Sequence, residues 1–152
     1  MIIRDAQRDD MAELLQLQKT AFISEAELYE NFNIQPLIQT LDELIMEYED
    51  SNKYFIVLMK ENRIIGSVRA EIKDDICFIQ KLIVHPDYQK KGYGKMLMNE
   101  IETKFKKYKK FQLFTGEKSD HNIRFYSKLG YRVVGKRKYI DDIHMVFMEK
   151  EN

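Results

Sequence analysis

The chain has 152 residues, of which 44% are hydrophobic and 33% charged, and its formal net charge at pH 7 is zero. These values are typical of one globular domain, so we expect a single domain over residues 1–152. No apolar run reaches the length of a membrane span, the N-terminus lacks a signal-peptide pattern, and one cysteine excludes an internal disulfide. The sequence therefore predicts a cytoplasmic protein with no membrane partner.

The charges are unevenly distributed along the chain. Residues 1–50 contain twelve acidic and three basic side chains, whereas residues 88–138 contain fifteen basic and four acidic ones. A basic region suits an anionic ligand, and an acidic region suits a cationic one. The lysine-rich run at 104–110 suggests a nucleic-acid site, but the balanced chain has no base-reading motif. We therefore expect no nucleic-acid partner.

The first fifty residues predict one short strand and two helices. Residues 2–4 form the strand, and one of the aspartates that follow it caps a helix whose apolar positions begin at Met11. Residues 22–35 are rich in Glu, Asn and aromatic side chains and lack clean periodicity, so they stay unassigned. Pro36 suits the start of a second helix, which ends near Asp50.

Three consecutive strands follow. Residues 54–59 and 63–73 predict a hairpin, and a turn at Asp74 and Asp75 leads into a β-branched apolar strand at 76–84. We expect these strands to form an antiparallel meander.

The last third of the chain predicts two further helices and three strands. After a helix that begins near Gly92, residues 111–115 form a short buried strand, parallel to the strand before that helix because a helix connects them. Ser119 or Asp120 caps a helix that a glycine ends, and residues 131–148 form a hairpin. The predicted order is β-α-α-β-β-β-α-β-α-β-β, which is a mixed, mostly antiparallel α/β (α+β) fold.

A loop with two glycines joins the strand at 76–84 to the helix near Gly92. Pro86 cannot continue the strand, and Gly92 and Gly94 stand where a helix start presents unpaired backbone N–H groups and favours negative charge. Glycine lets a phosphate approach the backbone closely. Positive charge is added by Lys90, Lys91 and Lys95. The loop therefore predicts a phosphate-binding site built from main chain.

Two common phosphate-binding fingerprints do not fit this loop. The dinucleotide fingerprint requires a third glycine where Leu97 stands, and no early βαβ unit surrounds it. The P-loop requires Gly-Lys followed by Ser or Thr, which this chain does not contain.

The run Gln89-Lys90-Lys91-Gly92-Tyr93-Gly94 instead resembles the Gln/Arg-x-x-Gly-x-Gly/Ala motif of the GCN5-related N-acetyltransferase (GNAT) family. The residues before it, 82–88, are similar to those of the family, and 121–131 resembles its Asn-x-x-x-x-Phe/Tyr-Tyr block. The predicted order of elements is also that of the family. The resemblance implies the GNAT fold, with a sheet of about seven strands and four helices.

The resemblance implies that acetyl-coenzyme A (acetyl-CoA) is the co-substrate and that no metal takes part. In the family, two strands splay apart, and the cofactor enters between them. The residues that would bind it here are Leu82, Ile83, Val84, Gln89, Lys90, Lys91, Gly92, Tyr93, Gly94, Lys95, Asn122 and Tyr126. The histidines and the cysteine show no metal-ligand spacing.

The chemistry of acetyl transfer suggests two catalytic groups. A backbone N–H at Val84 would stabilise negative charge on the thioester oxygen, and Tyr126 would protonate the departing thiolate. Without the resemblance, Tyr126 would be interpreted as an aromatic side chain that closes the core.

The general base is left open. Many family members carry an acidic residue on the strand before the glycine loop, but the equivalent side chains here are Phe78 and Gln80. The alternatives are Glu71, Glu30 or a chain of water molecules. His85 and His144 are interpreted as structural.

The acceptor is predicted from residues 25–33. The carboxylates of Glu25, Glu27 and Glu30, together with Tyr29 and the amides of Asn31 and Asn33, could hold an ammonium group. This predicts a small cationic amine with a second positive charge, bound chiefly by Glu27, Tyr29 and Glu30. The alternative is a solvated loop. Two other functions stay open, a non-catalytic acyl-CoA-binding or sensing module and a peptide N-terminal acetyltransferase. A homodimer is also left open.

Overall fold

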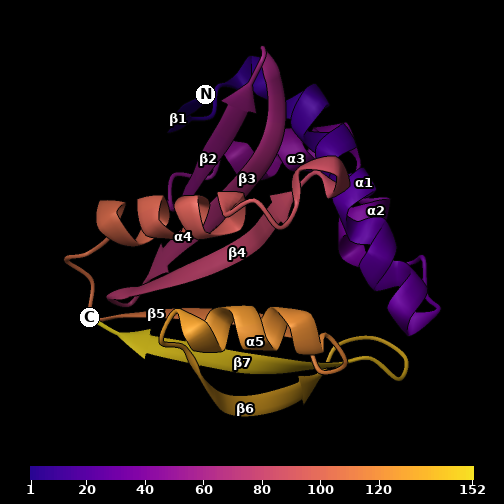
Figure 1. Cartoon of the computed structure of the whole chain (residues 1–152), viewed down its shortest axis with the longest axis vertical. Helices are drawn as coiled ribbons and strands as arrows, with labels where there is room; N and C mark the ends of the chain where they lie inside the picture. The colour runs from indigo at the N-terminus through magenta and orange to yellow at the C-terminus, as the bar shows by residue number, and fades with distance from the viewer.

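The computed structural model describes residues 1–152 as one seven-stranded sheet with five α-helices (Figure 1). The strands are β1 (Ile2–Asp5), β2 (Lys53–Lys60), β3 (Arg63–Lys73), β4 (Ile76–Val84), β5 (Lys110–Gly116), β6 (Arg132–Lys138) and β7 (His144–Glu151). The helices are α1 (Met11–Tyr29), α2 (Gln35–Ile38), α3 (Leu41–Tyr48), α4 (Tyr93–Lys104) and α5 (Asp120–Lys128), and the 3-10 turns are η1 (Arg8–Asp10) and η2 (Pro86–Tyr88). The predicted mixed α/β class is confirmed, with five helices in place of four.

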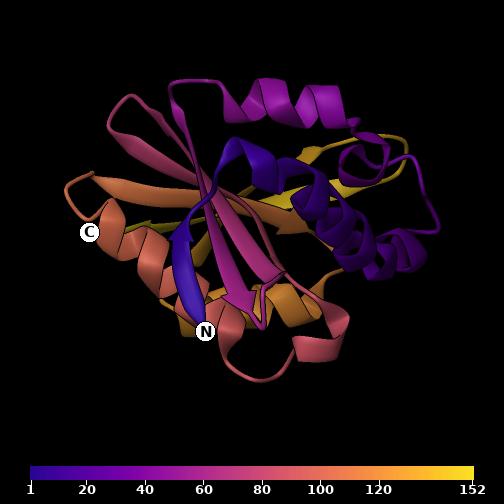
Figure 2. The same cartoon turned by 90° about the horizontal axis from the view of Figure 1, so that it is seen from above.

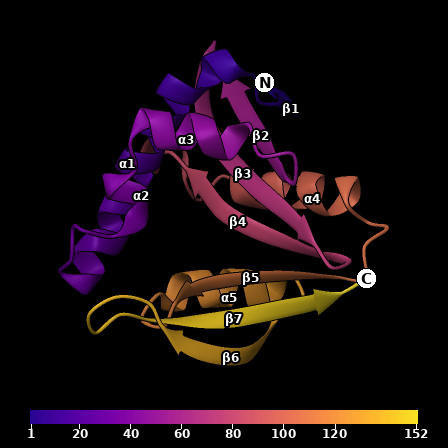
Figure 3. The same cartoon turned by 180° about the vertical axis from the view of Figure 1, so that it is seen from behind.

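The sheet has the order β1-β2-β3-β4-β5-β7-β6, and its only parallel pair is β4 with β5. These two strands pair over three residues, starting at Ile76 opposite Lys110. Beyond them, β4 continues beside β3 as far as Val84, and β5 continues beside β7 as far as Gly116. The two halves of the sheet therefore diverge between β4 and β5 (Figure 1, Figure 3).

Helices cover both faces of the sheet (Figure 2). α4 and α5 lie on one face, and α1, α2 and α3 lie on the other (Figure 1, Figure 3). Leu97 and Ile101 of α4 belong to the core on the first face, whereas Leu14 and Leu44 belong to the core on the second, and all four are fully buried. Burying each such side chain contributes about 1.5–3 kcal/mol, so the two cores hold the helices against the sheet.

The first helix is longer than predicted, and the aspartate at its N-cap position, Asp10, does not cap it with its side chain. α1 continues to Tyr29, through much of the stretch left unassigned, because Ala26 is fully buried against Ile34 and Ile143. The Asp10 side chain makes no capping hydrogen bond to α1. Its carboxylate instead pairs with Arg4 at 2.7 Å.

The predicted second helix is divided into α2 and α3. Gln39 leaves the helical conformation with ψ at 133°, and Thr40 then caps α3. The Thr40 hydroxyl accepts from the Glu43 amide at 3.2 Å, and the Glu43 carboxylate accepts from the Thr40 amide at 2.8 Å. This reciprocal capping box was present in the sequence as Thr-x-x-Glu and marks where a new helix begins.

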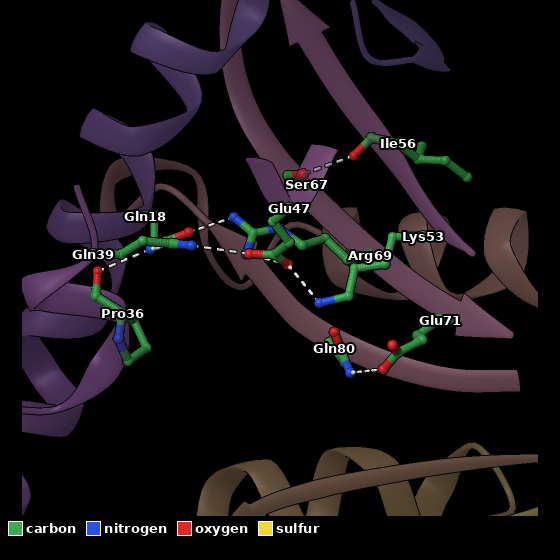
Figure 4. A network of polar contacts seen from close by, with 10 residues as sticks. All are labelled: Gln18, Pro36, Gln39, Glu47, Lys53, Ile56, Ser67, Arg69, Glu71 and Gln80. Carbon is green, nitrogen blue, oxygen red and sulfur yellow. Dashed lines mark hydrogen bonds and ion pairs between the residues drawn. The ribbon is translucent and has the colours of Figure 1, made fainter. Parts of the chain in front are cut away.

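A buried polar network ties α1 and α3 to β3 (Figure 4). The Arg69 side chain is 1% exposed, and its guanidinium contacts the carboxylate of Glu47 at 3.2 Å, the amide oxygen of Gln18 and the face of Phe55. Gln39 donates to Glu47 at 2.9 Å and accepts from Gln18 at 2.9 Å. A buried charge is tolerated when it is paired and hydrogen-bonded, so this network holds Glu47 of α3 against Arg69 of β3.

Candidate active site

Two cavities lie where β4 and β5 diverge. The first has a volume of about 760 Å³ and is bounded by the end of β4, the start of α4, the start of α5 and the second half of α1. The second has a volume of about 380 Å³ and extends along β4 and β5 beneath α1 and α2. Both are lined by Phe22, Glu25, Leu82, Asn122 and Tyr126. The divergence of the sheet therefore gives two neighbouring compartments that share one wall.

The loop before α4 contains consecutive backbone N–H groups that form no hydrogen bond within the protein. None of the amide N–H groups of residues 90–95 donates to an acceptor in the protein, and the first helical bond of α4 runs from Met96 to Gly92. Gly92 has a φ of 85°, a conformation that glycine adopts without strain. The Gln89 side chain donates to the Val84 carbonyl at 3.0 Å and holds the loop against β4. Six free donors at a helix start fit the two phosphates of a pyrophosphate.

The structure brings together most of the residues expected at the cofactor. Every one of them except Lys91 lines the first cavity. The Lys91 side chain is exposed and lies over the ring of Tyr88, with 6.0 Å between its ammonium and the ring centroid. The compartment therefore has the donors and the size for a long phosphate-bearing cofactor, and its wall is the unpaired part of β4.

The unpaired edge of β4 directs an amide into the gap. The amide of His85 donates to the carbonyl of Ile65 in β3 at 2.8 Å. Because neighbouring amides on a strand point in opposite directions, the amide of Val84 points away from β3 and toward the divergence. A donor in this position can stabilise negative charge that develops on an acyl oxygen.

Tyr126 stands where the two cavities meet. Its ring packs edge-on against Phe125 and Tyr131, at centroid distances of 5.2 Å and 6.0 Å. Burial, reinforced by the charge of Glu25, raises the pKa of the Tyr126 hydroxyl above its ordinary value. The hydroxyl therefore stays protonated at neutral pH and can donate a proton.

Glu25 is the acidic side chain at this junction. Its carboxylate accepts hydrogen bonds from the Ser119 hydroxyl at 2.6 Å and the Asn122 amide at 3.4 Å. Asn122 also donates to Thr115 at 3.3 Å. Ser119 or Asp120 was expected to cap α5. Ser119 is at the N-cap position, but its side chain makes no capping bond and is directed to Glu25 instead. The sequence placed Glu25 among the carboxylates that could hold the acceptor, in a stretch with no assigned secondary structure. The structure places it on α1, where its side chain lines both cavities.

Two of the acidic residues expected to bind the acceptor lie outside the site. Glu27 and Glu30 are exposed and line neither cavity, so the structure does not bring them to the site. Tyr29 does line the second cavity, and its hydroxyl accepts from the Lys118 amide at 2.7 Å. Glu71, a candidate base, lines neither cavity, and it accepts from Gln80 at 3.3 Å.

The charged lining of the second cavity consists of Glu25, Glu47, Lys53 and Lys81. Burial acts to raise the pKa of Glu47, but nearby cations, Arg69 above all, outweigh it and lower that pKa. Burial also lowers the pKa of Lys81 to about 8, and repulsion from Arg69 adds to the shift. The cavity therefore carries charges of both signs.

No group of three or more His, Cys, Asp or Glu side chains is arranged to hold a metal ion. None of the helices combines the length and the apolar character needed to cross a membrane.

Known proteins share both the sequence pattern and the fold. UPF0157 protein YqkA of Bacillus subtilis is 27% identical over 79% of this chain, which spans only 34% of the length of that relative. The uncharacterized protein YyaT of Bacillus subtilis is 26% identical over 93% of this chain and 89% of its own length.

Two solved structures match over nearly their whole length. The smu.2055 protein of Streptococcus mutans has a TM-score of 0.85 at 17% identity, with 99% of each chain covered. The PaiA N-acetyltransferase of Thermoplasma acidophilum, in complex with coenzyme A, has a TM-score of 0.74 at 21% identity, with 99% of this chain and 98% of that chain covered. A model of the acetyltransferase (GNAT) domain matches residues 5–152, and the chain therefore belongs to the GNAT family of acetyltransferases.

Proposed function

We propose that this acetyltransferase moves the acetyl group of acetyl-CoA directly to the primary amine of a small acceptor. The observation that carries the proposal is the junction of two cavities at Tyr126, one with free phosphate-binding amides and one with charged side chains of both signs. Direct transfer requires both substrates to be bound at once with their reacting atoms side by side. Two compartments that share a wall meet this requirement.

Acetyl-CoA would be held by main chain more than by side chains. The amides of residues 90–95 would bind its pyrophosphate, with Lys90 and Lys95 adding positive charge at the rim. Leu82 and Val84 line the first cavity along the unpaired edge of β4, where free backbone groups suit the amides of the pantetheine arm. The coenzyme A complex of the related PaiA enzyme agrees with this choice of cofactor.

Two groups of the chain would act on the thioester. Acetyl-CoA, when bound, supplies a thioester whose carbonyl carbon bonds to the amine nitrogen while its bond to sulfur breaks. The amide of Val84 donates a hydrogen bond to the carbonyl oxygen, where negative charge develops, and one such donor can contribute roughly 3 kcal/mol. The hydroxyl of Tyr126 gives its proton to the departing sulfur, and the proton that the nitrogen loses as the amide forms restores this hydroxyl.

Glu25 is our candidate for the group that receives the amine proton. An amine acceptor is an ammonium at neutral pH, and it must lose a proton for nitrogen to bond to carbon. The Glu25 carboxylate lines both cavities beside Tyr126, and Ser119 and Asn122 hold it in place. It therefore attracts the ammonium group to the point of transfer and takes its proton there.

Release of free thiol from acetyl-CoA on addition of an amine tests this proposal. We expect release with at least one acceptor in a panel of amino acids, polyamines, aminosugars and peptides. Glu25→Gln should lower kcat/KM for the amine, whereas the exposed Glu27→Gln should match the wild type. If coenzyme A binds but no amine releases thiol, the chain is an acyl-CoA-binding or sensing module and the proposal fails.

A further inference from the structure

Lys81 faces the second cavity because β4 contains a bulge. Between the pairs Ser67–Ile83 and Arg69–Gln80, β3 advances by two residues and β4 by three. Lys81 adopts a φ of 47° in this extra step. A regular strand would place residues 79 and 81 on one face.

The bulge changes which side chains share a face. Leu82 packs with Ile79 against the core beneath α4, so the two residues between them are both free to turn toward the opposite face. Gln80 and Lys81 both line the second cavity, on the side covered by α1 and α3. A long cationic side chain is thereby held inside a compartment that a small molecule can enter.

The ammonium of Lys81 has no counter-ion within the protein. It forms no ion pair or hydrogen bond, although the side chain is mostly withdrawn from solvent. Glu47 is the carboxylate that acts on it from nearby, but Glu47 is already engaged by Arg69 at 3.2 Å, by Gln39 at 2.9 Å and by Lys53 at 3.7 Å (Figure 4). Charges that are withdrawn from water are normally paired directly, and Lys81, which is partly buried, has no such direct partner.

The surrounding charges favour an anion as that partner. Lys53 and Lys81 line the second cavity, and Arg69 stands behind Glu47. The two anions near these three cations are Glu47 and Glu25, and Glu25 is at the junction. The part of the cavity lined by Lys53 and Lys81 is therefore positive, whereas the junction beside Tyr126 carries the negative charge of Glu25.

We propose that Lys81 binds an acidic group of the acceptor, so that the acceptor carries a carboxylate as well as the primary amine. This inference rests on the proposed function, because it assumes that the amine reaches Glu25. The carboxylate at one end of the molecule pairs with Lys81, and the ammonium at the other end pairs with Glu25. A cavity of about 380 Å³ is small for a ligand site and suits a molecule of the size of an amino acid.

A series of linear acceptors tests the charge preference. Chains of two to six carbons, each with one primary amine, would carry a carboxylate, a hydroxyl or a second amine at the other end. At the best chain length we expect kcat/KM to be at least about tenfold higher for the amino acid than for the amino alcohol, which is the effect of one charged hydrogen bond. A preference for the diamine, or equal rates for the three forms, would overturn the inference.

Two substitutions separate anion binding from proton transfer. Lys81→Met should remove the preference for the carboxylate by raising KM for the amino acid alone, and Lys81→Arg should restore it. Arginine binds carboxylates but cannot act as a base at neutral pH. If Lys81→Arg were as inactive as Lys81→Met toward every acceptor, Lys81 would be a base instead.

Binding gives a readout that does not depend on turnover. In the presence of coenzyme A, the amino acid should raise the Tm of the wild type more than the amino alcohol does, and this difference should vanish in Lys81→Met. A carboxylate-dependent shift without thiol release would retain this inference while the proposed function failed. Thiol release with no carboxylate dependence in either the Tm shift or the rate would support the proposed function and overturn this inference.

Discussion

The hydroxyl of Ser119 donates a hydrogen bond of 2.6 Å to the carboxylate of Glu25, across 94 positions of sequence. This bond ties the start of α5 to the last turns of α1. It fixes Glu25 beside Tyr126, whose pKa rises through burial and through the charge of Glu25. The proton donor and the carboxylate of the candidate active site are thereby held together by elements from opposite faces of the sheet.

The phosphate-binding loop should depend on the conformation of Gly92. Gly92→Val places a branched side chain at a φ of 85°, which costs about 1–2 kcal/mol and turns the loop amides away from their present directions. We expect the Kd for coenzyme A, measured by calorimetry, to rise by at least about tenfold, the worth of one charged hydrogen bond. Gly135→Val is the control, because a Cβ there meets nothing within 4 Å and its φ is negative. An unchanged Kd in Gly92→Val would remove this loop from the cofactor site.

Tyr126→Phe should separate chemistry from binding. The ring and its packing remain, so affinity for acetyl-CoA should change little, whereas kcat should fall roughly 10²–10⁴-fold with loss of the acid. Single-turnover measurements of thiol release give the rate of the chemical step. Tyr54→Phe, in which the ring is partly exposed on β2 and lies outside both cavities, is the matched control. Wild-type single-turnover rates in Tyr126→Phe would rule out Tyr126 as the acid.

Arg69→Met should be strongly destabilising. It removes the guanidinium that pairs with Glu47 and leaves that carboxylate without its main partner, which typically costs about 3–5 kcal/mol in the free energy of unfolding. Urea denaturation measures the loss, and Lys104→Met, which breaks the exposed pair with Asp5, should cost about 1 kcal/mol or less.

A double variant identifies the cause of this loss. If the cost of Arg69→Met comes from an uncompensated charge, Glu47→Gln in the same chain should recover part of it. If the loss of unfolding free energy in the double variant equals the sum of the losses in the two single variants, the cause is lost packing around Phe55.

Lys81 should make stability depend on alkaline pH. Its native pKa of about 8 lies below the ordinary value of 10.5, so between these pH values the unfolded chain binds more protons than the native one. The contribution of Lys81 to the stability of the wild type should therefore rise with pH through this window. Lys81→Met lacks the buried cation, so it should be more stable than the wild type below pH 8, by an amount on the order of 2 kcal/mol.

The advantage of Lys81→Met should shrink as pH rises toward 10.5. The charged groups that face Lys81 are Glu47 from α3, Lys53 from β2 and Arg69 from β3, and they are present in both proteins. Urea denaturation at pH 7, 8, 9 and 10 measures the difference, with the exposed Lys73→Met as the control. A constant difference between Lys81→Met and the wild type would show that Lys81 does not titrate in this window.

The loop proposed to bind phosphate could be located from the sequence because its signal lies in consecutive residues. The free amides of residues 90–95 lie between a strand that a proline ends and the start of a helix, and two glycines stand among them. All of these features are local in the sequence. The same holds for β3 and β4, whose predicted bounds agree with the structure. Local periodicity and turn residues are sufficient for such elements.

Glu25 and Lys81 could not be placed in this way, because tertiary contacts decide which way each side chain faces. Glu25 reaches the junction only because Ala26 buries against Ile34 and Ile143 and extends α1, and because Ser119 bonds to its carboxylate instead of capping α5. Lys81 reaches the second cavity only because the pairing of β4 with β3 contains an extra residue. The sequence by itself determined the fold class and the position of the glycine loop with its free amides. The positions of the Glu25 and Lys81 charges depend on helix length and strand register, which only the packed structure decides.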